Sequence, residues 1–190
     1  NYDFPHSLLG EYLAAYHLCL DRAYPRIAAR VTADGNWDEV IRLVAGHYVF
    51  VESYTRGAVK LVEELCGPAA NATAQEAVTD LEWRRVALAA DILHEMGSYH
   101  LGQEQGTDPP CRDLVCRLLV RLVPRGALPA RDRARAATIL GELGDPRSGV
   151  GVKGGLPEFH WLELPGGEFE LGEEPGRRVE VSAFRLSQYP

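Results

Sequence analysis

The chain has 190 residues, of which 46% are hydrophobic and 25% charged, as in a globular protein of one to one and a half domains. Its formal net charge of −7 removes the bulk electrostatic attraction on which nucleic-acid binding depends. Its apolar stretches are far shorter than the ~20 residues that span a bilayer, and its first residues do not resemble a signal peptide. We therefore expect a cytoplasmic chain with neither a membrane nor a nucleic acid as its partner.

Helical periodicity begins at Ser7, which is placed to cap a helix from Leu8 to about Asp21. Pro25 interrupts or restarts this helix, and a short segment follows to Arg30. One apolar stripe runs along the helix and consists of Leu8, Leu9, Tyr12, Leu13, Tyr16 and Leu20.

Further helices follow as far as Met96-Gly97. The capping-box pattern Asn36-x-x-Glu39 predicts a helix from Trp37 to about His47. Another is expected from about Val51 to Leu65, because Cys66-Gly67-Pro68 is a strong stop signal. Thr73 or Thr79 opens the next helix, and a loop over 98–110 closes it.

The last two predicted helices run from Cys111 to Val123 and from Pro129 to Leu143. Gly144-Asp145-Pro146 ends the second, a Gly-rich linker covers 148–157, and strand patterns begin at Trp161. The fold class we expect is mainly α, with antiparallel helix pairs in an irregular helical-repeat arm. A short β-hairpin region follows it.

The four cysteines lie in apolar helical contexts, which predicts buried, reduced thiols, as in a cytosolic protein. They are Cys19, Cys66, Cys111 and Cys116. The spacing of the last two is not that of a Cys-x-x-Cys zinc knuckle, and His94 and His100 do not have a His-x-x-x-His spacing, so we predict no metal site.

Residues 4–15 read Phe-Pro-His-Ser-Leu-Leu-Gly-Glu-Tyr-Leu-Ala-Ala. This segment resembles the Phe-x-His-x-x-x-x-Glu-Tyr-Leu-Ala-Ala signature near the end of the winged-helix part of NACHT-type signal-transduction NTPases, although the family prefers Ser-Phe-Gln at Leu8-Leu9-Gly10. The resemblance implies that an upstream nucleotide-binding domain binds ATP or ADP with Mg, whereas this segment itself holds no cofactor. It also implies that His6 contacts the phosphate of bound ADP and that exchange for ATP releases this contact. An imidazole N–H is a suitable donor to a phosphate oxygen.

The strand-rich segment has two motifs, Trp161-Leu-Glu-Leu-Pro165-Gly-Gly-Glu-Phe169-Glu-Leu-Gly172 and the run from Arg177 to Pro190. They resemble the opening of the formylglycine-generating enzyme (sulfatase-modifying factor) domain, which has a C-type-lectin-like α+β fold. Pro165-Gly166 fits a type II turn, and Val179, Val181 and Ala183 alternate as in a half-buried strand. That family's catalytic cysteines and metal ligands would lie beyond Pro190, so no catalytic residue is predicted here.

Together the two resemblances imply four segments. They are the end of a winged-helix-like part (1–30), a helical-repeat arm (31–147), a Gly-rich linker (148–157) and the incomplete start of a lectin-like domain (158–190). The segment from Arg131 to Arg147 also looks like the helix that precedes this domain in NACHT-linked proteins.

Three weaker signals are interpreted as structural. Gly149-x-Gly151-x-x-Gly154 follows a helix rather than a strand, so linker flexibility explains it better than a dinucleotide site. Arg117, Arg121 and Arg125 recur every four residues, and we expect a solvated face paired with acids. Asp91 and Glu95 lie one turn apart, and we expect a surface patch.

The function that we expect is that of a non-catalytic connecting segment in a bacterial NACHT-type NTPase. It would couple nucleotide state to a C-terminal sensor or effector, respond to an activating ligand that the sequence does not name, and permit oligomerisation on activation. One alternative is an accessory part of a formylglycine-generating oxidase, and another is a helical-repeat protein-binding scaffold.

Overall fold

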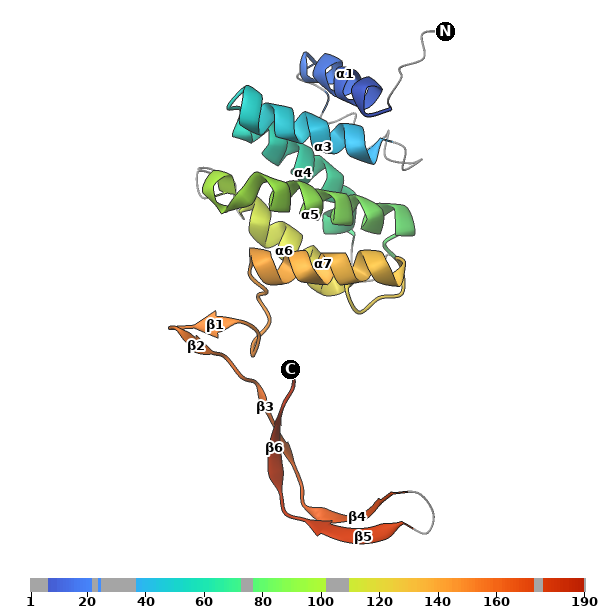
Figure 1. Cartoon of the computed structure of the whole chain (residues 1–190), viewed down its shortest axis with the longest axis vertical. Coiled ribbons are helices and arrows are strands. Elements are labelled where there is room, and N and C mark those ends of the chain that lie inside the picture. Colours follow the sequence, from blue (N-terminus) through green and yellow to red (C-terminus); the bar gives the residue numbers. More distant parts are fainter. Residues whose placement is uncertain are drawn as a thin grey trace. The chain divides into compact units, whose positions relative to one another are not determined.

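The computed structural model describes residues 7–21, 24, 37–72, 77–101, 110–172 and 176–189, without the side chains of 98–101 and 153. Within these residues the chain forms two compact units, Asn1–Gly144 and Asp145–Pro190. The first unit is helical and the second contains short antiparallel strands (Figure 1). The mainly α fold class with a short strand region is therefore confirmed.

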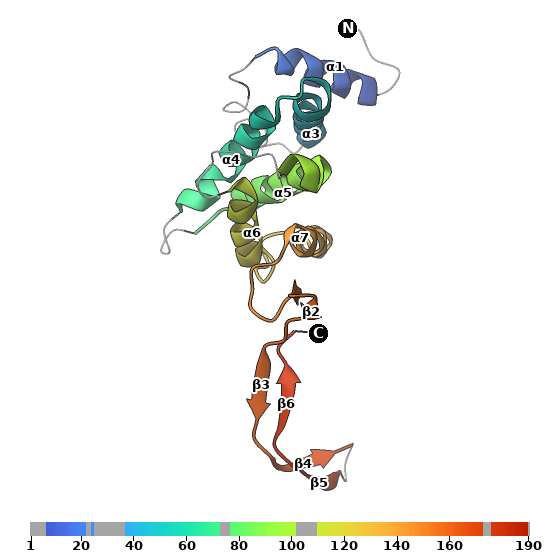
Figure 2. The same cartoon turned by 90° about the vertical axis from the view of Figure 1, so that its left-hand side faces the viewer.

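The helical unit has α1 (Ser7–Cys19), α3 (Asp38–Gly46), the π-helical turn η2 (His47–Val51), α4 (Thr55–Asn71), α5 (Asp80–Leu101), α6 (Cys111–Leu122) and α7 (Ala130–Leu143). Figure 2 shows α3, α5 and α7 nearly end on in one column, with α4 and α6 in a second column beside it. Direct packing of α3 on α5, of α5 on α7 and of α4 on α6 agrees with these two layers. No helix in the described ranges is both long and apolar enough to cross a membrane.

One continuous apolar core fills the space between the two layers. Its largest fully buried side chains include Trp83, Ile41, Leu65, Leu93 and Leu119, which come from four different helices. Burial of this many large apolar groups is the dominant favourable contribution to folding, so the helices depend on one another for stability.

The helix α4 continues beyond its predicted stop. Cys66-Gly67-Pro68 was expected to end it at Leu65, and this was wrong, since the helix runs to Asn71. Pro68 removes one N–H donor, but it lies in the last turn, where only one intrahelical bond is lost. Leu65, Cys66 and Ala69 are buried, and their packing compensates for that loss. The predicted start at Val51 was also wrong, because the π-helical turn occupies that position.

The helix α5 begins with a capping box that the sequence left as one of two choices. The Thr79 backbone N–H donates to Glu82 Oε2 at 2.6 Å, and the Glu82 N–H donates to Thr79 Oγ1 at 3.3 Å. The loop expected from Ser98 was wrong over its first part, since helical backbone resumes beyond a kink at Gly97, whose φ is 73°. Only glycine adopts this φ without strain. The cap predicted at Asn36 lies outside the described residues.

The remaining helix predictions are close to the structure. The helices α6 and α7 agree with their predicted ranges to within a residue, and Gly144 follows α7 with a φ of 102°. The first helix starts at Ser7, one residue before the predicted start at Leu8, and ends at Cys19, two residues before the expected end.

The second unit is made of three two-stranded antiparallel sheets. They pair β1 (Val152–Lys153) with β2 (Leu156–Pro157), β3 (Trp161–Leu164) with β6 (Phe184–Ser187), and β4 (Gly167–Leu171) with β5 (Arg177–Val181). The pairing of β3 with β6 encloses the β4–β5 hairpin, as Figure 1 shows.

Two glycine segments differ from their predictions. The linker expected over 148–157 contains the β1–β2 hairpin, whose turn residues Gly154 and Gly155 have φ of 61° and 82°, values that suit a tight hairpin turn. The prediction of a type II turn at Pro165-Gly166 was wrong, because such a turn requires a positive φ at its third residue and Gly166 does not have one. Glycine is needed there for a different reason, since a Cβ would lie 2.7 Å from the Val181 carbonyl oxygen.

Two glycines in the helices provide a matched test of the packing. A Cβ at Gly57 in α4 would overlap the ring of Tyr54, which is held edge-on against Tyr48 with centroids 5.6 Å apart. We expect Gly57→Ala to lower the free energy of unfolding by about 1–3 kcal/mol. A Cβ at Gly141 in α7 meets no atom within 4 Å, so Gly141→Ala should raise it by about 0.5–1 kcal/mol. Urea denaturation of both variants checks this, and equal effects would contradict the packing at Gly57.

A charged pair at the start of the second unit provides a pH test. The Asp145 carboxyl is buried, which disfavours its charge, but hydrogen bonds from Arg147 outweigh this and lower its pKa. A carboxyl with a lowered pKa in the folded state adds stability above its unfolded pKa, and that stability is lost as the pH falls through the folded value. NMR titration should give Asp145 a pKa below the ordinary value and show that Arg147→Ala raises it. Arg185→Ala, which removes the pair with Glu163 in the same unit, is the control and should leave it unchanged.

Candidate functional site

His6, the one site residue predicted from the sequence, lies outside the described residues. Its contact with a phosphate and the division into four segments therefore stay predictions. Among the hollows that described residues of the helical unit line, one lies between α3, α5 and α7 and another lies beside α1.

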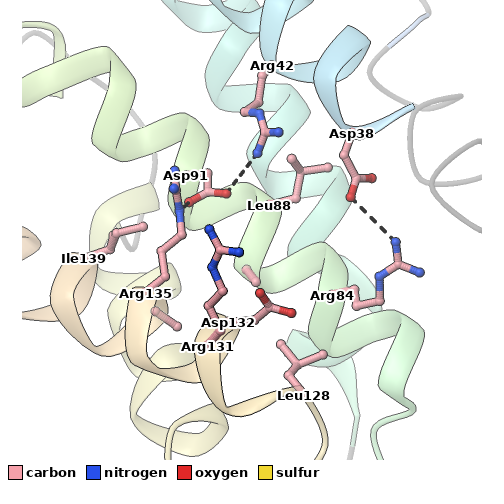
Figure 3. Close-up of a pocket in the computed structure, with 12 residues that line it drawn as sticks. Asp38, Arg42, Arg84, Leu88, Asp91, Leu128, Arg131, Asp132, Arg135 and Ile139 are labelled. Atoms are coloured by element: carbon pink, nitrogen blue, oxygen red, sulfur yellow. Dashed lines mark hydrogen bonds and ion pairs between the residues drawn. The ribbon is translucent and has the colours of Figure 1, made fainter. Parts of the chain in front are cut away.

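The first hollow surrounds a buried aspartate. Asp91 of α5 is 9% exposed, and it accepts hydrogen bonds from two guanidinium groups of other helices. Arg42 Nη1 of α3 lies 3.1 Å from its Oδ2, and Arg135 Nε of α7 lies 2.6 Å from its Oδ1 (Figure 3). One carboxylate thus links α3, α5 and α7. Its two partners, Arg42 and Arg135, lie 49 and 44 residues from it in sequence.

Further charged side chains surround this aspartate. Arg42 also donates to Glu39 Oε2 at 2.8 Å, and Arg84 Nη2 lies 3.6 Å from Asp38 Oδ2. The hollow has a volume of about 350 Å³. Among the residues that line it are Asp38, Arg42, Arg84, Asp91, Arg131, Asp132 and Arg135. We call these seven residues the ionic cluster.

Partial burial shapes the electrostatics of the ionic cluster. Burial raises the pKa of Asp38, and the nearby charge of Asp91 adds to this, although Arg84 and Arg42 lower it. Burial alone would lower the pKa of Arg42, but the hydrogen bond and charge of Glu39 raise it above its usual range. The cluster consists of arginines and aspartates, and the contacts of Asp91 with Arg42 and Arg135 and of Asp38 with Arg84 are ion pairs. We conclude that it holds α3, α5 and α7 in register.

The expectation that Asp91 and Glu95 form a surface patch was wrong for Asp91. The residues next to Asp91 in sequence do not identify its partners, because Arg42 and Arg135 come into contact with it only when the helices pack. Arg131, Asp132, Arg133 and Arg135 are crowded at the start of α7, but a run of charged residues in a first turn does not show which of them faces a partner.

The second hollow lies beside α1 and has a volume of about 270 Å³. Its lining combines apolar and acidic side chains with one imidazole and is made up of Tyr12, Glu39, Arg42, Leu43, Gly46, His47, Val51 and Glu95. The His47 ring contacts Tyr16 of α1 edge-on, with centroids 5.5 Å apart, and its Nε2 lies 3.5 Å from Glu52 Oε1. We call this space the α1 hollow.

Two arginines of the predicted stripe, Arg121 on α6 and Arg125 just beyond it, have no acidic partner in the part of the chain that the structure describes. Arg121 and Arg125 each lie 5.7 Å from the centroid of Trp83, and Arg121 donates to the Ala69 carbonyl oxygen at 3.4 Å. The ring is 1% exposed, so the two guanidinium groups help to cover it. Aromatic and main-chain contacts therefore replace the expected acidic partners.

Other candidates from the sequence also have structural roles. Gly149 and Gly151 have φ of 83° and 93°, and a Cβ at Gly149 would lie 2.5 Å from the His160 backbone nitrogen, so a close approach of the chain explains this glycine better than linker flexibility. His94 Nε2 lies 2.5 Å from Glu142 Oε2, whereas the side chain of His100 is outside the described set. No group of three metal-binding side chains occurs within the described ranges.

All four cysteines are buried as predicted, and none of them forms a disulfide. Burial raises the pKa of Cys66 to about 12, and the charge of Glu63 adds to this. Since the thiolate is the reactive form, this thiol is unreactive near neutral pH.

Comparisons with protein-family models, with curated proteins and with solved structures found no match to this chain. Its function is therefore inferred from its own residues and surfaces.

The role of Asp91 can be tested through stability. We expect Asp91→Ala to lower the free energy of unfolding by about 2 kcal/mol, because it removes the shared acceptor and leaves the half-buried Arg42 with only Glu39. Arg135→Ala removes only the more exposed partner and should cost less than about 1 kcal/mol. Urea denaturation measures both, and an equal or smaller loss for Asp91→Ala would show that the aspartate is not the centre of the network.

Proposed function

We propose that this chain is a non-catalytic connecting segment that couples the nucleotide state of a NACHT-type NTPase unit to a C-terminal sensor or effector of the formylglycine-generating-enzyme type. In this proposal it works in the cytoplasm of a bacterium and takes part in signal transduction. The observation that carries the proposal is the exposure of large apolar side chains on α1 and on the strands, because a connecting segment needs a contact surface for each of its neighbours.

The helix α1 provides the first contact surface. Its predicted apolar stripe exists, but it faces away from the core. Leu8, Leu9, Tyr12, Leu13, Tyr16 and Leu20 are between 42% and 66% exposed. The buried positions of α1 are the small residues Ala15 and Cys19, which pack toward α3. We call the six outward side chains the α1 stripe, and we propose that it contacts the nucleotide-binding unit.

The strands of the second unit provide the other contact surface. Trp161 is 51% exposed, Phe169 46%, Phe184 46% and Leu186 54%. Two-stranded sheets of this kind are marginal in water by themselves, and further strands or a packed partner stabilise them. Partial burial of Val179 and Val181 supports the predicted strand alternation, whereas Ala183 is exposed and lies between β5 and β6. We propose that a lectin-like α+β domain supplies the missing partners.

The helices between α1 and the strands suit a mechanical role. In this proposal α3–α7 form the helical-repeat arm, and the ionic cluster keeps one of its layers in register. The same two layers favour a second candidate function, a helical-repeat scaffold that binds proteins without any nucleotide switch. The accessory domain of a formylglycine-generating oxidase stays an alternative. Because its four thiols are buried, we propose that this chain would have a structural rather than a catalytic role in such an oxidase.

The switch can be tested at His6 in the full-length protein. If the His6 imidazole donates a hydrogen bond to the ADP phosphate, we expect His6→Ala to release ADP about tenfold faster, since such a bond contributes about 1–2 kcal/mol. His17→Ala, on the exposed side of α1, is the matched control and should leave the release rate unchanged. Stopped-flow measurement with a fluorescent ADP analogue gives the rates. Unchanged release from His6→Ala would remove the switch and favour the scaffold.

A further inference from the structure

The helix α1 packs in the opposite way to most surface helices. A surface helix usually turns its large apolar residues to the core and its polar residues to water. Here Ala15 and Cys19 are 1% exposed, while the α1 stripe is open to solvent. Leu18 is the large residue of α1 that packs partly against the core, whereas the α1 stripe stays exposed and available for a partner.

The α1 hollow adjoins this stripe and shares Tyr12 with it. Tyr12, Leu43 and Val51 form apolar walls, and Val51 is itself 66% exposed. Glu39 and Glu95 add carboxylates to the same lining. A cavity with apolar walls and acidic groups suits a side chain that has an aliphatic stem and a cationic head.

The charges in the α1 hollow favour a cation. Its two carboxylates face one guanidinium, that of Arg42, which is bonded to Glu39 and also to Asp91. Glu95 forms no ion pair with any residue that the structure describes. Burial raises the pKa of Glu95, and the charges of Asp91 and Glu39 add to this against the effect of Arg42. The hollow therefore has an excess of negative charge that a bound lysine or arginine would compensate.

We propose that the α1 surface binds an amphipathic helix of a partner protein, whose apolar side chains cover the α1 stripe and whose lysine or arginine enters the α1 hollow beside Glu39 and Glu95. This rests on the proposed function in taking α1 as a receiving surface, and it adds the chemistry of what α1 receives. Leucine-type side chains laid on a helical stripe are a common form of helix recognition. The Tyr12 ring in the wall is a suitable face for the cation.

Two other occupants fit the charges less well. A second copy of the chain would bring its own α1, in which His17 is the only basic residue, so a twofold contact between α1 helices supplies neither lysine nor arginine to the hollow. An anionic membrane surface would be repelled by Glu39 and Glu95. A basic amphipathic helix satisfies both the stripe and the hollow.

The test uses the whole chain and two synthetic helical peptides of about 18 residues, or five turns. Both peptides carry a leucine face, and one has lysines where the other has glutamines. We expect the lysine peptide to bind more tightly, and Glu95→Gln to weaken its binding about five- to tenfold, because a partly desolvated charge pair is lost. Glu64→Gln, an exposed residue of α4, removes the same charge elsewhere and should change the Kd less than twofold. Fluorescence anisotropy at about physiological salt measures the Kd values while screening distant charges.

The outcomes separate this proposal from the function on which it rests. If Glu95→Gln and Glu64→Gln have equal effects, or if the glutamine peptide binds as tightly, insertion of a cation is overturned. Leu13→Glu, on the exposed stripe, then decides the remaining question. Loss of binding in Leu13→Glu keeps α1 as a docking surface, whereas unchanged binding removes α1 as the receiving surface and overturns the partner helix, and the coupling function is still decided by ADP release from His6→Ala. Self-association or vesicle binding that Leu13→Glu abolishes would identify a second copy or a lipid surface as the occupant and overturn the partner helix.

Discussion

The hydrogen bonds that Asp91 accepts from Arg42 and Arg135 are the polar constraint on which one helical layer depends. Apolar packing holds the two layers together, but the hydrophobic effect that drives it is non-directional and does not by itself select which residues face one another. A nearly buried carboxylate that needs both guanidinium groups has one arrangement in which it is satisfied. The ionic cluster therefore fixes how α3, α5 and α7 align, and with them the surfaces that these helices carry.

That alignment also forms the α1 hollow. Glu39 and Arg42 belong to α3, and Glu95 lies one turn beyond Asp91 on α5, so the bond between Arg42 and Asp91 sets the position of Glu95 relative to Glu39. Arg42 contributes to both hollows. The ionic cluster and the α1 hollow thus share Arg42. A substitution that disturbs the ionic cluster should therefore also change the shape of the α1 hollow.

Much of the fold was accessible from local patterns. The helices α1, α6 and α7, the capping choice at Thr79 and the strand segments follow from periodicity and from stop signals, which act over a few residues. The errors arose where tertiary packing overrode a local signal. Buried side chains in the last turn carry α4 past Pro68, and a close approach of the chain, rather than positive φ, accounts for Gly166. The ionic cluster was not predicted, because nothing in the sequence near Asp91 identifies partners 44 and 49 residues away.

The sequence alone determined the fold class, the order of most helices and strands, the burial of the four thiols and the existence of an apolar stripe on α1. These properties depend on the spacing of side chains along one helix or strand, and that spacing can be read from the sequence. Only the tertiary structure decided which way the stripe faces, since Ala15 and Cys19 occupy the fully buried positions of α1, with Leu18 packed partly beside them, and the larger residues of the stripe stay outside. It also decided that Asp91 is a buried link between helices, because a charge is held inside a protein only when packing brings its partners to it.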